Sequence, residues 1–204
     1  MRTGLNGLQE RQRKHSPADM AVIQRYGDGR RFAETFNPDL QKVCAQNVER
    51  SFAGDAPTIA TAMSAYNIEQ VRVWILAQIE NLNQFAGTKN KMNPGQMTML
   101  SDIIITEYYY LKASELLLFF FQFKSGKYGE LYGSVDPLRI TSALVEFASY
   151  RRGMISKIED EKRRKESEKS EREKVAITRR EYRMRKLAKS GKTWKIKRNE
   201  SGNK

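Results

Sequence analysis

The segment "KASELLLFFFQFKSG" (Lys112–Gly126) decides the fold that the sequence predicts. Its apolar residues run without interruption from Leu116 to Phe121, so a helix here would be apolar on nearly every side. A helix of that kind is buried at the centre of a bundle. The sequence leaves two starts open: the segment continues the preceding helix, or it begins a new helix with Ser114 as its N-cap.

Helical periodicity dominates upstream of this segment. Asn67 is the predicted N-cap of a helix that ends at Gly87. Its apolar residues recur at spacings of three and four, which is the period of one helix face. That face consists of Ile68, Val71, Ile75, Ile79 and Leu82, with Trp74 beside it.

Prolines mark three further helix starts. Pro38 is predicted at the first position of a helix that runs through Phe52, and Pro94 begins another. Asp136 and Pro137 form an N-cap and first-turn pair for the last helix, which continues into a charged segment. No pair of alternating strands and no βαβ unit is visible. The fold class predicted is therefore all-α: a small helical bundle with a long charged C-terminal helix and a basic tail.

Composition divides the chain into four predicted parts. Residues 1–54 form an irregular, partly helical N-terminal segment, and residues 55–152 form the helical core domain. Residues 153–173 mix both charges and predict a solvated helix supported by i,i+4 pairs. Residues 174–204 form a basic, flexible tail.

The charge of the chain is concentrated at its C-terminal end. The 204 residues carry a formal net charge of +13. Residues 55–150 hold 7 Lys/Arg and 9 Asp/Glu, whereas residues 151–204 hold 21 and 9. A strongly basic balance points to an anionic partner, above all nucleic acid. With one cysteine and one histidine, the chain has no disulfide framework and no Cys/His zinc site, and we expect a soluble protein of the reducing cytoplasm without a membrane span.

The stretch "KVAITRREYRMRKLAKSGKTWKIKR" (Lys174–Arg198) carries 11 basic residues and a single acidic one, Glu181. Lys and Arg neutralise phosphates while aromatic rings stack on unpaired bases. The predicted nucleic-acid-binding residues are Lys174, Arg179, Arg180, Tyr182, Arg183, Arg185, Lys186, Lys192, Trp194, Lys195, Lys197 and Arg198. A tail that only aids solubility remains an alternative. A membrane-surface helix is less favoured, because the apolar residues do not form one continuous face.

The segment "KSGKYGELYGSVDP" (Lys124–Pro137) has two interpretations. In the first, it connects two helices: Gly126 is a left-handed C-cap, Gly129 and Gly133 allow turns, and the tyrosines fold onto the bundle. In the second, it is an exposed partner-binding loop. The residues of that loop would be Lys124, Lys127, Tyr128 and Tyr132. Turn chemistry alone explains the glycines, so the first interpretation is favoured.

Catalytic chemistry finds no support in the sequence. "KSGKT" (Lys189–Thr193) resembles the end of a phosphate-binding loop, but Lys186 occupies the position that requires a glycine, and no strand precedes it. Glu107 and Glu115 fall two helical turns apart on similar faces; buried glutamates can have raised pKa values and act in catalysis, but these two can also simply pair with Lys112 or Arg139. We therefore predict no enzyme, no catalytic residue, no metal site and no cofactor.

The chain resembles a known family in the region "EYYYLKASELLLFFFQFKSGKYGELYGSVDPLRITSALVEFASYR" (107–151). A Tyr-Leu-Lys…Ser-Glu…Phe-Phe helix followed by Gly-x-Tyr-Gly-x-x-Tyr-Gly-x-x-Asp-Pro is similar to small uncharacterised proteins of Bacteroides-type bacteria and their mobile elements. The resemblance covers residues 55–152 and implies no established activity. The general plan of a small bundle with a charged terminus also resembles phage helicase-loader and replication-accessory proteins.

These observations lead to one hypothesis and one alternative. The hypothesis is a non-enzymatic nucleic-acid-binding accessory protein of a bacterial mobile element or phage, associated with replication. In it the bundle docks a partner and the basic tail binds phosphates without sequence preference. The alternative is a protein–protein interaction or structural module that uses the Gly/Tyr loop. DNA versus RNA, the protein partner and the oligomeric state are left open.

Overall fold

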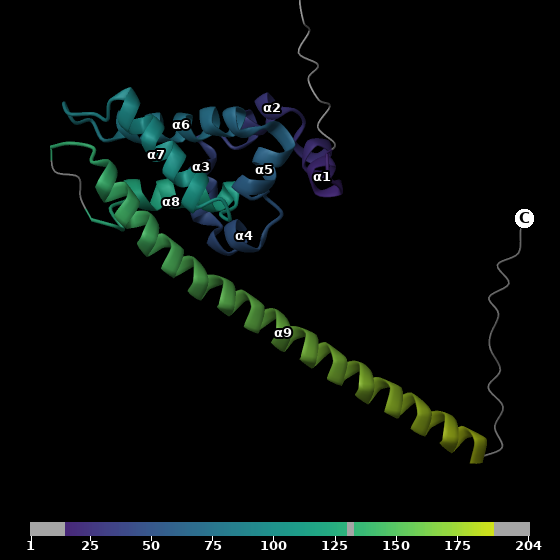
Figure 1. The fold of residues 1–204 in the computed structure, drawn as a ribbon. Coiled ribbons are helices and arrows are strands. Elements are labelled where there is room, and N and C mark those ends of the chain that lie inside the picture. Colours follow the sequence, from purple (N-terminus) through teal and green to yellow (C-terminus); the bar gives the residue numbers. More distant parts are fainter. Residues whose placement is uncertain (1–14, 130–132, 190–204) are drawn as a thin grey trace, which may run out of the picture. The chain divides into compact units, whose positions relative to one another are not determined.

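A computed structural model of the protein describes residues 15–129 and 133–189. Over these two ranges the chain forms nine helices and no β-strand, which confirms the predicted all-α class (Figure 1). None of the helices in the described ranges combines the length and apolar character that a membrane span requires. The chain divides into two compact units, one that ends at Ile155 and one that begins at Ser156.

Four short helices precede residue 55: α1 (Pro17–Tyr26), α2 (Gly29–Thr35), α3 (Leu40–Gln46) and α4 (Val48–Ala53). They supply core side chains, among them Phe32 and Phe52, which are 2% and 3% exposed. The predicted single helix from Pro38 is wrong, because the chain breaks at Asn47 (φ −127°, ψ 59°). The Asn47 side chain donates from Nδ2 to the Val43 carbonyl at 3.2 Å, a local bond that competes with helix continuation.

The next three helices are α5 (Ile59–Tyr66), α6 (Ile68–Phe85) and α7 (Pro94–Glu107). The predicted N-cap of α6 is confirmed, since Asn67 Oδ1 accepts from the Gln70 amide at 2.9 Å. Four of the five residues predicted for its buried face are fully covered: Val71, Ile75, Ile79 and Leu82. The fifth, Ile68, is 42% exposed, because it occupies the first position of the helix, where the apolar face is only partly covered.

Helix α8 (Ala113–Lys124) is the centre of the bundle, as predicted. It lies among α3, α4 and α6 (Figure 1). Ten of its twelve residues are buried. It begins as a new helix, but its N-cap is Lys112 and the prediction of Ser114 is wrong. Glu115 Oε2 accepts from the Lys112 amide at 2.8 Å, whereas the Ser114 hydroxyl donates to the Ser51 carbonyl on α4 at 2.8 Å.

The end of α8 has the predicted left-handed glycine. Gly126 has a φ of 79°, and its amide donates to the Phe123 carbonyl at 3.1 Å. The Lys127 amide donates to the Gln122 carbonyl at 3.1 Å, which completes a Schellman motif. The helix therefore stops where the sequence predicts, and the chain turns back onto the bundle.

Helix α9 (Pro137–Lys189) begins at the predicted Asp-Pro pair. The Asp136 carboxylate accepts from the Leu138 amide at 2.9 Å. Within the first unit, Ile140, Leu144 and Phe147 of α9 are fully buried. The ring of Phe147 lies 5.5 Å from that of Phe119 on α8, so the start of α9 is part of the core.

The second unit contains the remainder of α9, which we divide into a balanced stretch (156–173) and a basic stretch (174–189). The helix extends through the basic stretch to Lys189, beyond the predicted end of the helix at Glu173. The physical reason is composition: the basic stretch is rich in Arg, Lys, Ala, Met and Leu and contains no glycine or proline.

Candidate nucleic-acid interface

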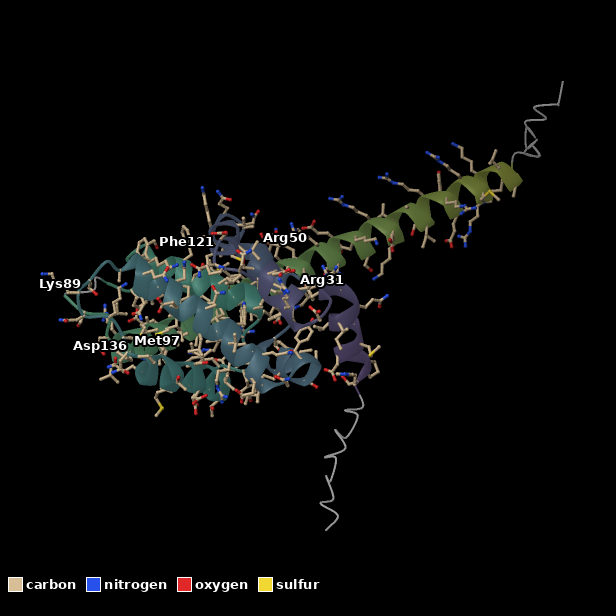
Figure 2. All side chains as sticks on the ribbon, turned by 90° about the horizontal axis from the view of Figure 1, so that it is seen from above. Arg31, Arg50, Lys89, Met97, Phe121 and Asp136 are labelled. Carbon is tan, nitrogen blue, oxygen red and sulfur yellow. The ribbon has the colours of Figure 1, made fainter. Side chains whose placement is uncertain are left out.

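The basic stretch presents its side chains on a regular, exposed helix. The predicted nucleic-acid-binding residues that the structure describes all lie there and are exposed: Lys174, Arg179, Arg180, Tyr182, Arg183, Arg185 and Lys186. Figure 2 shows nitrogen-tipped side chains projecting from this yellow-green end of α9. The other five predicted residues, Lys192, Trp194, Lys195, Lys197 and Arg198, lie outside the described residues.

The two stretches of α9 differ in how their charges are compensated. The balanced stretch has seven basic and seven acidic residues, and the basic stretch has seven basic residues and Glu181. Ion pairs join oppositely charged residues of the balanced stretch: Arg163–Asp160 at 3.2 Å, Arg164–Glu168 at 3.8 Å, Lys165–Glu161 at 2.8 Å and Lys169–Glu173 at 4.0 Å. Among the residues that the structure describes, no carboxylate forms an ion pair with a cation of the basic stretch.

Helical geometry arranges these cations in two rows. Successive residues of an α-helix are rotated by about 100°, so residues spaced by three, four, seven or eleven share a side. The first row consists of Arg179, Arg183 and Lys186 together with Arg172, the last cation of the balanced stretch, and the second row consists of Lys174, Arg185 and Lys189; Arg180 belongs to neither row. On this geometry the two rows are about 120° apart around the helix axis. Sequence reasoning missed Arg172 and Lys189, although the spacing of seven between Arg172 and Arg179 is a usable signal.

Val175 and Tyr182 lie between the two rows, one heptad apart. Their exposed fractions are 51% and 67%, so an apolar and an aromatic side chain are presented in the middle of a cationic face. Ile177 and Met184 lie on the other half of the helix and are 58% and 59% exposed. By the same geometry Arg180 lies about 40° from Met184 and about 60° from Ile177 around the axis, which places a charge within that apolar half.

The Gly/Tyr loop is arranged differently. Tyr128 is 5% exposed, with its hydroxyl donating to Gln122 Oε1 at 2.7 Å and its ring 5.8 Å from that of Phe119. Burial raises the pKa of Tyr128. Lys127 Nζ donates to the same Gln122 oxygen at 3.2 Å and lies 3.6 Å from the centre of the Tyr150 ring. The structure thus folds Tyr128 onto the bundle, and the interpretation that presents its ring to a partner does not hold; Tyr132 lies outside the described residues.

Lys124, the remaining residue of the predicted loop site, belongs to a polar network inside the bundle. Its Nζ donates to Gln41 Oε1 at 2.8 Å and to Asn81 Oδ1, and Gln41 Nε2 donates to Gln78 Oε1 at 2.8 Å. Burial lowers the pKa of Lys124 to about 8. Its ammonium is therefore engaged with neutral amides of α3 and α6 and is only partly open to solvent.

The carboxylates expected to share a face do not form a pair. Glu107 is the exposed last residue of α7, whereas Glu115 is fully buried in the first turn of α8. Glu115 Oε2 accepts from Arg151 Nε at 2.9 Å. The alternative of pairing with Arg139 or the Lys112 side chain is not observed, since Arg139 donates to the Tyr128 carbonyl and Lys112 Nζ donates to the Phe52 and Gly54 carbonyls.

The environment of Glu115 is that of a structural charge. Burial raises the pKa of Glu115, while its hydrogen bonds from Arg151 and the Lys112 amide oppose the rise. Its Oε1 has no hydrogen-bond partner in the part of the chain that the structure describes. The Glu115–Arg151 pair links α8 to α9 at this point, and the hydrogen bonds of Glu115 in the described part of the chain come from Arg151 and the Lys112 amide.

Comparison with known proteins gives one match. A family model described as a family of unknown function (DUF6633) matches residues 91–193, slightly more than half of the chain. The matched region includes α7, α8 and the basic stretch. It confirms the predicted resemblance to an uncharacterised family. No curated protein and no solved structure matches the chain.

Proposed function

From the premise that the chain belongs to this family of unknown function (DUF6633), we propose that the protein is a non-enzymatic nucleic-acid-binding accessory protein. The basic stretch and the residues that follow it bind phosphates, and the bundle provides a docking surface for a protein partner. Because the sequence resembles proteins of bacterial mobile elements and phage replication-accessory proteins, the process we propose for it is replication of a bacterial mobile element or phage.

The observation that carries this proposal is the uncompensated charge of the basic stretch. In the balanced stretch, carboxylates neutralise cations locally, whereas the seven cations of the basic stretch have no described carboxylate partner. Solvent ions must compensate such a surface when it is free. A polyphosphate ligand replaces those ions, and the release of the ligand's own counterions drives binding.

The exposed aromatic ring in the same stretch supports the same ligand class. Tyr182 is 67% exposed in the basic stretch, which has seven cations among its sixteen residues. An exposed ring gains by contact with a base, and cations beside it hold the phosphates. A tail that served solubility alone would need the charge but would have no use for the ring.

The test compares two triple variants that change the total charge equally. One replaces Arg179, Arg183 and Lys186 with Gln in the basic stretch, and the other replaces Arg163, Arg164 and Lys169 with Gln in the balanced stretch. Gln and the basic residues have similar helix propensities, so circular dichroism should show unchanged helix content in both. Affinity for labelled DNA and RNA oligonucleotides is measured by fluorescence anisotropy in low salt.

We expect the first variant to bind at least about 10-fold more weakly, because cations without carboxylate partners contact phosphates. The second should change affinity by less than about 3-fold, because each of its three cations already has a carboxylate partner. Equal losses in both variants would mean that only total charge matters, and absence of binding by the unmodified chain would refute the proposal outright.

A further inference from the structure

We infer that the basic stretch of α9 lies in the major groove of duplex DNA, with its two rows of cations facing the two phosphate backbones. The inference rests on the proposed function and narrows it from nucleic acid in general to one form. It follows from the arrangement of the cations around the helix rather than from their number.

The two rows match the two walls of a groove. A helix with its side chains is about 10–12 Å across, and the major groove of B-DNA is about 12 Å wide, so one helix fits. With the helix in the groove, a phosphate backbone runs along each side of it. Rows about 120° apart place Arg179 and Arg183 toward one backbone and Lys174 and Arg185 toward the other.

The residues between the rows suit the floor of the groove. Val175 and Tyr182 lie on the arc that separates the two rows, so they face the base edges when each row faces a backbone. The major-groove floor exposes thymine methyl groups, which accept apolar contacts, together with hydrogen-bonding atoms within reach of a tyrosine hydroxyl.

The length of the rows also fits. Arg172 and Lys189, the outermost cations, are about 25 Å apart along the axis at 1.5 Å per residue. A helix that lies along the groove is inclined to the DNA axis, so this length spans a few base pairs, over which each row has a backbone beside it.

Other ligands match less of this pattern. A single strand offers one backbone, so it engages one row at a time and leaves the other without a partner. An RNA duplex has a major groove too narrow and deep to admit a helix. A lipid surface requires a purely apolar half on the helix, and Arg180 lies within that half between Ile177 and Met184.

The first experiment compares ligands with the full chain. Fluorescence anisotropy measures its affinity for a 20-bp DNA duplex, each of the separated strands and the RNA duplex of the same sequence, in low salt. We expect the DNA duplex to bind at least about 10-fold more tightly than the others, since only it engages both rows. Flotation with vesicles of anionic phospholipid serves as the comparison for a lipid surface.

The second experiment tests the rows and the groove. One variant replaces Arg179, Arg183 and Lys186 with Gln, and the other replaces Lys174, Arg185 and Lys189 with Gln. Each should weaken duplex binding to a similar degree and reduce the preference for duplex over single strand to under about 3-fold. A duplex whose cytosines carry glucosylated hydroxymethyl groups, which fill the major groove, should bind at least about 10-fold more weakly, and the minor-groove ligand netropsin should not compete.

The outcomes separate this inference from the proposed function. Equal or tighter binding of single strands or duplex RNA, unchanged affinity for the groove-filled duplex, or competition by netropsin overturns the groove assignment and leaves a nucleic-acid-binding protein. Capture by anionic vesicles without binding to any nucleic acid overturns both. Loss of affinity in only one of the two row variants also overturns the assignment, because a helix in the groove uses both rows.

Discussion

Charged side chains serve opposite purposes in the bundle and in the basic stretch of α9. In the bundle, Glu115 accepts from Arg151 and from the Lys112 amide, and Lys124 donates to amide oxygens of its neighbours. In the basic stretch, cations are exposed and no described carboxylate pairs with them. In the bundle, stability depends on the position of each charge relative to its partner. In the basic stretch, the proposed binding of phosphates depends on how many cations there are and on which side of the helix they lie.

Energetic magnitudes follow the same division. Removing one partner of a buried ion pair costs about 3–5 kcal/mol, because the other charge is left without compensation in a poorly solvated site. An exposed ion pair contributes about 0–1 kcal/mol. Changes in the bundle should therefore appear in stability, and changes in the basic stretch should appear in affinity.

The largest expected effect is that of salt on binding. If six or more cations of the basic stretch contact phosphates, raising monovalent salt from about 50 to 200 mM should reduce nucleic-acid affinity on the order of 10³-fold. The unfolding temperature of the bundle should shift little over the same range, since its exposed charges contribute little to stability and its buried Glu115–Arg151 pair is poorly screened by salt. Anisotropy titrations and thermal melts at matched salt concentrations measure both. A flat affinity would show that the cations do not contact phosphates.

The next effect concerns the buried pair. Replacing Arg151 with Met should lower the free energy of unfolding by about 3 kcal/mol, because Glu115 is fully buried and loses its charged partner. The loss should shrink as the pH falls, because burial raises the pKa of Glu115 and the variant lacks the Arg151 hydrogen bond that opposes this rise, so that protonation removes the uncompensated charge. Adding Glu115→Gln should regain more than half of it, and nucleic-acid affinity should stay unchanged. Urea denaturation measures the free energy of unfolding of each variant. If Arg151→Met lowers it by less than about 1 kcal/mol, the Glu115–Arg151 pair contributes no more to stability than an exposed ion pair.

Local signals in the sequence predicted the ends of several elements. Asn67, Gly126 and the Asp136–Pro137 pair each act on a backbone group within a few residues, so their roles follow from residue type and spacing. The central position of α8 followed from an apolar run that can be satisfied only by burial on all sides. Most of the fold could therefore be predicted from residues that act on their near neighbours in the sequence.

What the sequence did not reveal depends on contacts between distant segments. Arg151 is 36 residues from Glu115, and no spacing rule connects them. Ser114 has the chemistry of an N-cap, but the Ser51 carbonyl occupies its hydroxyl. The candidate interface differs, because the composition of the sequence is enough to locate the basic stretch. The division of its cations into rows follows only from the structure, in which the helix is continuous through Lys189.

A smaller effect is expected from pH through Lys124. Its folded-state pKa of about 8 lies below its ordinary value of 10.5, so between these values the unfolded chain holds a proton that the folded chain has released. Stability therefore rises with pH in that window. For this partly buried group we expect a rise of about 1–2 kcal/mol.

Urea denaturation between pH 7.5 and 10 measures this rise against Lys124→Met, in which it should become smaller; burial also lowers the pKa of Lys127, which contributes the rise that is left. Lys42→Met, at an exposed lysine of α3, is the control and should keep the slope of the unmodified chain. Identical slopes in all three proteins would show that the ammonium of Lys124 is as well solvated as an exposed one.

The smallest expected effect comes from exchanging one cation for another. Arg151→Lys should destabilise the bundle by about 1–2 kcal/mol, because lysine has no Nε–H to donate to Glu115 and is a compact, strongly hydrated charge. Arg183→Lys in the basic stretch should leave the unfolding temperature unchanged and alter DNA affinity by less than about 3-fold, since binding to phosphates without sequence preference needs a positive charge on that side of the helix. Melts and anisotropy on both variants give the comparison. A large affinity loss in Arg183→Lys would mean that this guanidinium makes a bidentate contact, and the basic stretch would then depend on position as the bundle does.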